Sequence, residues 1–169
     1  MKDMGFTHES THNETMEWYT PPAVFDALGL CFDMDVASPG KAIVPWIPAA
    51  EHLTLRENGL VHPWDGRVWL NPPYGSLPLK WVAKFSRWSD GVMLVFARPD
   101  TAWFHDFAVE CSAVLFMRGR IRFIGADVYC GQGCGAASML LAQGEDCVRA
   151  LRASGLGFFI DLRLNRIGS

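Results

Sequence analysis

Four consecutive residues, Asn71 to Tyr74, have the chemistry needed to hold a planar amine. They follow Val68-Trp69-Leu70, a short apolar run of residues that favour β-strands. Asn71 contributes an amide side chain, while Pro72 and Pro73 fix φ, remove two backbone N–H donors and keep the preceding backbone extended. Tyr74 adds a flat aromatic face. An amide oxygen, a rigid carbonyl acceptor and a stacking ring are therefore predicted to meet at the end of a strand.

An acidic residue lies at the end of another predicted strand, earlier in the chain. The residues from Phe32 to Val36 alternate between apolar and acidic side chains, and small residues and a proline follow. This pattern predicts a strand with Asp35 near its carboxyl end, the edge at which open α/β sheets bind ligands. The glycine-rich loop expected after such a strand is missing, because Ala37-Ser38-Pro39-Gly40 stands there. Because of its position at the carboxyl end of the strand, Asp35 is still predicted to contact a ligand.

A short helix is predicted between these two features and the N-terminus. Thr20 suits the N-cap, Pro21 the first helical position and Gly29 the C-terminal stop. The free N–H groups at a helix start attract carboxylates. Two interpretations of Thr20 stay open: part of a ligand site, or the cap of an ordinary helix.

The stretch from Gly40 to Gly66 is predicted to hold a small part of the sheet. Ala42-Ile43-Val44 predicts a short strand, and Glu51 to Glu57 predicts one or two helical turns. A parallel crossover needs about a dozen residues or more. This stretch therefore holds one crossover unit, or two compressed ones, and one half of the sheet is truncated.

The rest of the chain predicts an α/β fold with a mixed, mostly parallel sheet. An amphipathic helix is expected to run to about Ser89, and the apolar run of residues 92–97 is expected to be a strand buried on both faces. Strand, helix and strand over about 30 residues form a βαβ unit. Further predicted elements are strands at Ala113–Met117, Ser138–Ala142 and Leu156–Leu162 and a helix at Glu145–Arg152.

Several basic and aromatic residues are candidates for contacts with nucleic acid. Arg118, Arg120 and Arg122 alternate in a predicted strand that reaches Ile124, which would place three guanidiniums on one face. Phosphate contact and an exposed hairpin face are both open interpretations. Trp103 is either core or the wall of a base pocket, and His105 is expected to be a surface or capping residue rather than a base. Lys80 and Arg98 complete this candidate set.

Composition predicts one globular domain in a reducing compartment. The 169 residues suit a single domain at residues 16–169 after a flexible tail at residues 1–15, and half of them are hydrophobic. No apolar run approaches the roughly 20 residues that span a bilayer, and five irregularly spaced cysteines predict free thiols. Cys130 and Cys134 lack a second pair, so no metal site is predicted. A net charge of −3 leaves room for a local basic groove.

Several motifs, taken in order, resemble one family. Over roughly residues 16–143 the chain is similar to the bacteriophage DNA N-6-adenine-methyltransferases, which are small Dam-type phage enzymes. The Asn-Pro-Pro-Tyr turn is also shared with cytosine-N4, glutamine and RNA methyltransferases, whereas the Trp-Phe-His and Arg-Gly-Arg segments are more specific. The matching segments are Glu17-Trp18-Tyr19-Thr20-Pro21, Phe32-Asp33-Met34-Asp35-Val36-Ala37, Val68-Trp69-Leu70-Asn71-Pro72-Pro73-Tyr74-Gly75, Lys80-Trp81-Val82, Ala97-Arg98-Pro99-Asp100-Thr101-Ala102-Trp103-Phe104-His105, Phe116-Met117-Arg118-Gly119-Arg120-Ile121-Arg122-Phe123 and Ala137-Ser138-Met139.

The resemblance implies a compact Rossmann-like methyltransferase fold, S-adenosylmethionine as cofactor and adenine in double-stranded DNA as substrate. It implies that Asn71 and Pro72 orient the amino group of a flipped adenine, that Pro73 stiffens the turn and that Tyr74 stacks on the base. A monomer or homodimer, no membrane partner and a location in the bacterial cytoplasm, as a phage or prophage protein, are expected. The residues expected at the cofactor are Tyr19, Thr20, Pro21, Asp35, Ala37, Asn58 and Asn71.

Other functions fit parts of the same pattern. The amine of cytosine N4 has the same geometry, so a cytosine-N4 methyltransferase is one alternative. The missing glycine-rich loop and the truncated sheet are also compatible with a non-catalytic protein that binds DNA as a decoy. A protein or RNA methyltransferase is a third, disfavoured by the flanking segments.

Overall fold

The computed structural model describes residues 18–73, 78–125 and 137–166. The tail at residues 1–15 and the Cys130 and Cys134 loop lie outside them. The elements in chain order are β1 (Trp18–Tyr19), α1 (Pro22–Leu28), β2 (Phe32–Asp35), β3 (Ala49–His52), β4 (Val68–Leu70), α2 (Pro78–Ser86), β5 (Gly91–Phe96), α3 (Ala102–Asp106), η1 (Ala108–Glu110), β6 (Ala113–Met117), β7 (Ile124–Gly125), β8 (Ser138–Gln143), α4 (Glu145–Ala153), β9 (Gly157–Asp161) and η2 (Leu162–Arg166).

In the part of the chain that the structure describes, a seven-stranded mixed sheet has the order β3-β2-β4-β5-β8-β6-β9. β2 pairs in parallel with β3 and β4, and β4 pairs in parallel with β5. β8 is antiparallel to both β5 and β6, and β9 is antiparallel to β6. β2 to β6 therefore all point the same way. The carboxyl ends of β2 and β4, which carry Asp35 and lead into Asn71, consequently share one edge of the sheet.

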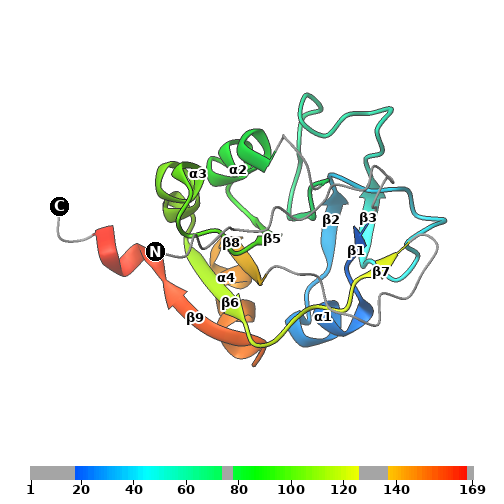
Figure 1. The fold of residues 1–169 in the computed structure, drawn as a ribbon. Helices are drawn as coiled ribbons and strands as arrows, with labels where there is room; N and C mark the ends of the chain where they lie inside the picture. The colour runs from blue at the N-terminus through cyan, green and yellow to red at the C-terminus, as the bar shows by residue number, and fades with distance from the viewer. Residues whose placement is uncertain (1–17, 74–77, 126–136, 167–169) are drawn as a thin grey trace, which may run out of the picture.

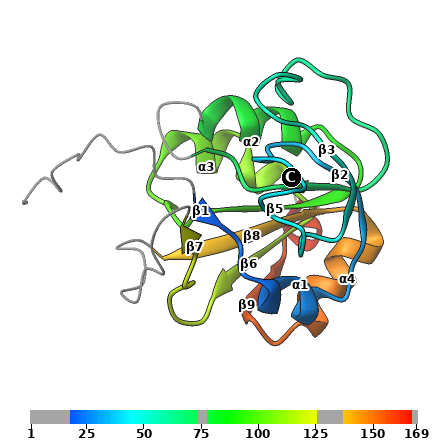
Figure 2. The same ribbon diagram turned by 90° about the vertical axis from the view of Figure 1, so that its right-hand side faces the viewer.

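Helices cover both faces of this sheet. Figures 1 and 2 show α2 and α3 on one side of the strands and α1 and α4 on the other. Each face has its own apolar cluster, because alternate side chains of a strand point to opposite faces. In β4, for example, Trp69 packs toward α1, whereas Val68 and Leu70 pack toward α2. The fold is thus a three-layer arrangement, which confirms the predicted α/β class with a mixed sheet. The sheet is less parallel than predicted, because β5-β8, β8-β6 and β6-β9 are antiparallel pairs.

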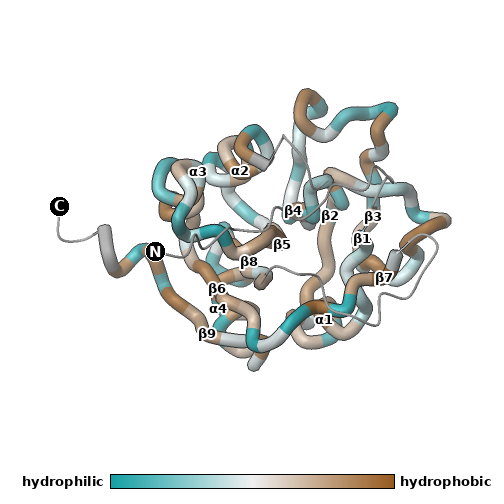
Figure 3. Tube along the Cα trace, in the orientation of Figure 1, coloured by the Kyte–Doolittle hydropathy of each residue, from teal (hydrophilic) through white to brown (hydrophobic). Residues whose placement is uncertain are grey.

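The middle of the sheet is apolar on both faces. Figure 3 shows tan and brown tube along β5, β8 and β6. The first five residues of β5 and all of β8 are buried. Such continuous burial explains why these segments read as apolar runs rather than as alternating patterns. Within the described residues, no helix is long and apolar enough to cross a membrane.

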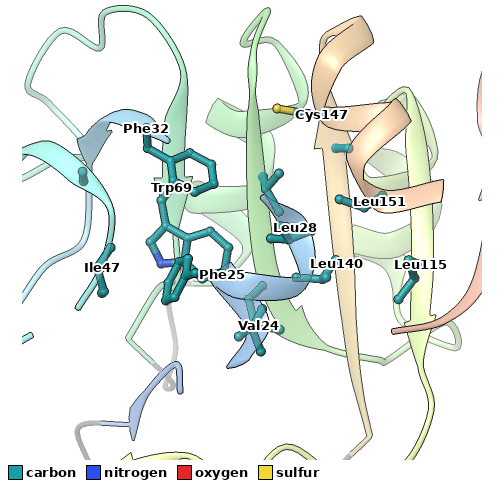
Figure 4. Packing of buried hydrophobic residues seen from close by; sticks show 14 of the residues in the cluster. Val24, Phe25, Leu28, Phe32, Ile47, Trp69, Leu115, Leu140, Cys147 and Leu151 are labelled. Carbon is teal, nitrogen blue, oxygen red and sulfur yellow. The ribbon is translucent and has the colours of Figure 1, made fainter. Parts of the chain in front are cut away.

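An aromatic cluster fixes α1 against the sheet. The ring centroid of Phe25 lies 4.7 Å from that of Trp69, and Phe32 lies 5.5 Å from the same indole. Figure 4 shows these three rings together, with Val24 and Leu28 of α1 beside them. A short helix such as α1 is stable only when it packs against the rest of the protein, and the spacing of its apolar residues lets it bury one face against the strands.

Many of the predicted elements are confirmed. The strand ending at Asp35, the βαβ unit through α2, and the strands β6, β8 and β9 all form, as does the helix α4. Gly29 ends α1 with φ of 61°, and its N–H donates to the Phe25 carbonyl at 2.9 Å. Glycine is suited to this left-handed conformation because it has no Cβ.

Two predicted elements between residues 40 and 60 are wrong, and the predicted end of α2 is wrong as well. Ala42-Ile43-Val44 is a turn, because the N–H groups of Ile43 and Val44 donate back to the Gly40 carbonyl. The edge strand is β3 instead, and it includes Glu51 and His52, which were expected in a helical turn. α2 ends at Ser86 rather than near Ser89.

Two further predictions fail around the β1–β7 ribbon. Residues 118–123 do not form a strand; only Ile124 and Gly125 pair, with Tyr19 and Trp18. Alternation persists locally, since Ile121 and Phe123 are buried and the arginines between and before them are exposed. Thr20 is not an N-cap, because α1 begins at Pro22 and its N-cap residue is Pro21.

Candidate active site

A cavity opens at the carboxyl edge shared by β2 and β4. Its volume is about 310 Å³, which lies in the range of small-molecule sites, roughly 300–1,000 Å³. The segments that line it include residues 18–20, the end of β2 with the loop after it, and the turn after β4. Of the residues predicted from sequence, Tyr19, Thr20, Asp35, Ala37, Asn58, Asn71, Pro72 and Pro73 line this cavity.

A hydrogen bond from β1 orients the side chain of Asn71. Its Nδ2 donates to the backbone carbonyl oxygen of Trp18 at 2.7 Å. A carbonyl can only accept, so this contact assigns which end of the amide carries the nitrogen. The side-chain oxygen is thereby directed away from Trp18. Pro72 is buried and Pro73 is exposed beside it, and Tyr74 lies outside the described residues.

A buried polar cluster surrounds Asp35. The side chain of Asp35 is 3% exposed, its Oδ2 lies 3.5 Å from His52 Nδ1, and its Oδ1 accepts from the Ala37 N–H at 3.5 Å. His52 Nδ1 also lies 2.9 Å from Ser38 Oγ, which accepts from the Gly40 N–H. Both contacts of His52 use the same ring nitrogen, so this is not the relay of a Ser-His-Asp triad, which needs opposite nitrogens. The cluster instead fixes the loop that follows β2.

Thr20 is a buried residue of the cavity wall. None of its surface is exposed, and its hydroxyl has no hydrogen-bond partner in the part of the chain described. Its carbonyl accepts from the Trp46 indole N–H at 2.9 Å. Thr20 therefore contributes to the cavity wall as a fully buried residue.

The loop after β3 forms another wall. Leu53, Thr54, Leu55, Asn58 and Gly59 all face the cavity. Asn58 has a positive φ of 52°, and its Oδ1 accepts from the Leu60 N–H at 3.3 Å.

A tight turn lies within this wall. The Glu57 carboxylate accepts from the Thr54 hydroxyl at 2.6 Å and from the Thr54 N–H at 2.8 Å. These hydrogen bonds hold the pKa of Glu57 below its ordinary value. The turn presents Leu55 at the cavity mouth, where its side chain is 89% exposed.

None of the predicted nucleic-acid residues lines the cavity. Lys80 is exposed on α2 and Arg98 is exposed after β5, while Trp103 is half-buried against the core on the α2 side. Arg118, Arg120 and Arg122 are exposed and border a second hollow with Pro21 and Ile124. The second hollow thus lies between the start of α1 and the segment that leads into β7, so Pro21 does not line the cavity.

Sequence reasoning missed several residues of the site. Trp18, Ser38 and His52 make contacts that fix Asn71 and Asp35, and Trp81 of α2 lines the cavity. Placing the edge strand at residues 49–52 would have predicted His52 beside Asp35, because parallel strands bring their carboxyl ends to one edge. No local signal pointed to the carbonyl of Trp18. In the described residues there is also no cluster of three His, Cys, Asp or Glu side chains that could hold a metal ion.

The sequence was then compared with known proteins. The model of a family described as DNA N-6-adenine-methyltransferase (Dam) matches residues 8–145, which is more than half of the 169-residue chain. A search of curated proteins found no match. The matched region contains β1 to β8 and every residue that lines the cavity.

Proposed function

Because the chain belongs to the DNA N-6-adenine-methyltransferase (Dam) family, we propose that it transfers a methyl group from S-adenosylmethionine to the exocyclic nitrogen of adenine at specific sites in double-stranded DNA. The observation that carries this proposal is the placement of Asn71 and Pro72 on the wall of the cavity that also contains Asp35. An amide that can hold an amine and a pocket that can hold a donor are thus adjacent. This adjacency is what a one-step group transfer requires.

The cavity wall fits S-adenosylmethionine in chemical type. It combines the Asp35 carboxylate and the Asn58 amide with the apolar side chains of Ile43, Leu55 and Trp81. Such a mixture suits a ligand that has an adenine ring, ribose hydroxyls and charged amino-acid groups. We propose that Asp35 and Asn58 hold polar groups of the cofactor, that Tyr19 and Ala37 contact it, and that Thr20 supports the wall. When bound, S-adenosylmethionine supplies an electrophilic methyl group.

The turn after β4 is proposed to hold the adenine amino group. The adenine amino group is a poor nucleophile, because its lone pair is delocalised into the ring. We propose that Asn71 Oδ1 and the Pro72 carbonyl accept its two N–H bonds and hold the nitrogen nearer to tetrahedral geometry. The lone pair can then point toward the cavity. Tyr74 is proposed to stack on the flipped base, which is worth roughly 1–3 kcal/mol and offsets part of the cost of flipping.

The DNA is proposed to contact the exposed basic residues through its phosphates. Arg118, Arg120 and Arg122 lie together beside the start of α1, and Lys80 and Arg98 are exposed elsewhere. Phosphate contacts follow local patches of charge, so a chain with net charge −3 can still bind DNA through them. Half-buried Trp103 is assigned to the core rather than to a base contact, because it packs against the apolar cluster beside α2.

Two finer statements about the fold belong to this proposal. The run of parallel strands β3-β2-β4-β5, with ligand residues at their carboxyl edge, supports a Rossmann-like methyltransferase fold. Residues 16–169 are proposed to form one domain, because both apolar clusters share strands of the same sheet. Phage or prophage origin, the cytoplasmic location and the oligomeric state stay predictions.

Calorimetry and a methyl-transfer assay together test the proposed function. We expect S-adenosylmethionine to bind to the wild-type protein with one site per chain, and radiolabel to pass from it to DNA. Asn71→Ala should lower kcat by about 10²–10³-fold, as removal of one preorganised polar group at a reacting centre does elsewhere, while cofactor binding changes little. A wild-type protein that binds no cofactor would contradict the proposal and would favour the decoy alternative.

A further inference from the structure

We propose that Lys84 is a positioning residue that holds the cavity loop, defined as residues 53–62, in the shape that binds the cofactor. This inference rests on the proposed function, since the ligand concerned is S-adenosylmethionine. Lys84 lies on α2 and does not line the cavity. Its effect on the ligand is therefore exerted through the loop.

The Lys84 ammonium is saturated by backbone oxygens of the loop. Its Nζ donates to the carbonyls of Gly59 at 2.9 Å, Leu60 at 3.2 Å and His62 at 2.7 Å. An ammonium has three donors and no acceptor, so three carbonyls satisfy it completely. These three acceptors come from four consecutive residues. One side chain thus fixes the path of the backbone where the loop turns.

An indole reinforces the same point. The Trp64 N–H donates to the Gly59 carbonyl at 2.7 Å, and Lys84 Nζ lies 4.3 Å from the centre of the Trp64 ring. The Gly59 carbonyl therefore accepts from both side chains. Hydrogen bonds that involve a charged partner are stronger than neutral ones, and a cation over an aromatic face adds to them.

The fixed carbonyl belongs to a residue of the cavity wall that has no room to move toward β2. A Cβ placed on Gly59 would lie 1.8 Å from the Val36 carbonyl oxygen and 3.2 Å from Trp81. Gly59 is thus pressed between the end of β2 and the indole of α2, which itself lines the cavity. Asn58 precedes it with a positive φ of 52°. The amide of Asn58 is aimed by this backbone, so loss of the clamp should misplace it.

Lys84 also connects the Asn71 turn, which is proposed to hold the amine, with the cavity loop, which is proposed to hold the cofactor. α2 follows the Asn71 turn in the chain, and its Trp81 and Lys84 contact the cofactor half. Burial of the Lys84 ammonium lowers its pKa, because burial disfavours the charged form. The three carbonyls that face the ammonium act against this effect of burial, because they accept hydrogen bonds from its charged form.

The test compares Lys84→Met with the wild-type protein. The change keeps the length of the side chain and removes all three donors. We expect the Kd and KM for S-adenosylmethionine to rise by about tenfold or more, since even one hydrogen bond to a charged group is worth that factor. The KM for DNA and the kcat at saturating cofactor should stay near wild type. Lys84→Arg, which retains the charge, should recover part of the loss.

Hydrogen exchange gives a readout that does not depend on the cofactor. The N–H groups of Leu60, Val61 and His62 all donate to Asn58, and they should exchange faster in Lys84→Met. Arg87→Met is the matched control, because Arg87 is an exposed cation just beyond the same helix; it should change neither exchange nor affinity. If Lys84→Met fails to fold, Trp64→Phe removes one donor to Gly59 and should weaken binding in the same direction.

The outcomes separate this inference from the function on which it rests. Wild-type protein that binds the cofactor, with Lys84→Met that binds equally well or exchanges equally slowly, would overturn the role of Lys84 alone. Equal losses in kcat and in the affinities for both substrates would also overturn it, because they would indicate general damage to the fold. Wild-type protein that binds no cofactor would overturn both proposals together.

Discussion

Asn71→Asp separates the two jobs that the structure gives to one amide. The side chain of Asn71 donates through Nδ2 to the Trp18 carbonyl at 2.7 Å, and we propose that its oxygen accepts from the substrate amine. Aspartate keeps an acceptor oxygen and has nearly the same shape. It has no N–H, however, so a carboxylate oxygen would face a carbonyl oxygen at that distance. The carboxylate must then rotate, or β1 must move away.

The expected magnitude follows from the hydrogen bond that is lost. Leaving a buried or half-buried carbonyl without its donor costs about 1–3 kcal/mol. If that cost falls on the reactive geometry, kcat/KM for methyl transfer decreases about 5- to 150-fold. Asn71→Ala removes the acceptor as well, so its loss should be the larger of the two. The order of activity is therefore wild type, then Asp, then Ala.

Steady-state transfer of a labelled methyl group to DNA measures these ratios, and calorimetry with S-adenosylmethionine measures cofactor binding separately. Binding by Asn71→Asp should stay within a few-fold of wild type, since Asp35 and Asn58 are unchanged. Wild-type kcat/KM in Asn71→Asp would refute the orienting role of the Trp18 carbonyl. A loss that appeared only as weaker cofactor binding would assign Asn71 to the cofactor instead.

Two further predictions concern packing and pH. Gly59→Ala places a methyl group 1.8 Å from the Val36 carbonyl oxygen, so we expect overpacking to lower the free energy of unfolding by about 1–3 kcal/mol and to weaken cofactor binding. Urea unfolding measures the first effect and calorimetry the second. Unchanged stability and affinity in this variant would show that the loop is not confined at Gly59. Burial, with a hydrogen bond to Asp90, raises the pKa of the Cys147 thiol from 9.0 to about 12. The unfolded state therefore loses this proton first, and stability should fall as pH rises from 9 toward 12, with a limiting slope of about 1.4 kcal/mol per pH unit. Urea unfolding of the wild type and Cys147→Ala at pH 8 to 10.5 measures that slope, which Cys147→Ala should reduce; parallel curves would contradict it.

Strands with strong local patterns were predictable. The alternation that ends at Asp35 and the apolar runs of β5 and β8 identify strands, because the order of apolar and polar residues shows which side chains of a strand are buried. β3 was missed because Ala49–His52 has few β-prone residues and derives its conformation from pairing with β2. The more β-prone run, Ala42 to Val44, turns back on Gly40.

In the candidate site, too, features with a local sequence pattern were predictable and long-range contacts were not. The Asn-Pro-Pro turn and the acid at Asp35 could be placed at one edge of a sheet, because both follow parallel strands. The contacts that orient them involve distant partners: the Trp18 carbonyl lies 53 positions before Asn71. Nothing in the sequence around Lys84 predicts its contacts, because only the fold brings three carbonyls of a distant loop to it. Long-range packing of this kind leaves no periodic trace in a single sequence.

Nucleoside analysis tests the central claim most directly. Unmethylated DNA is incubated with the full chain and S-adenosylmethionine, digested to nucleosides and examined by mass spectrometry, with Asn71→Ala in parallel. We expect N6-methyldeoxyadenosine with the wild type and a strongly reduced amount with Asn71→Ala. N4-methyldeoxycytidine instead, or no methylated nucleoside from a protein that binds the cofactor, would contradict it.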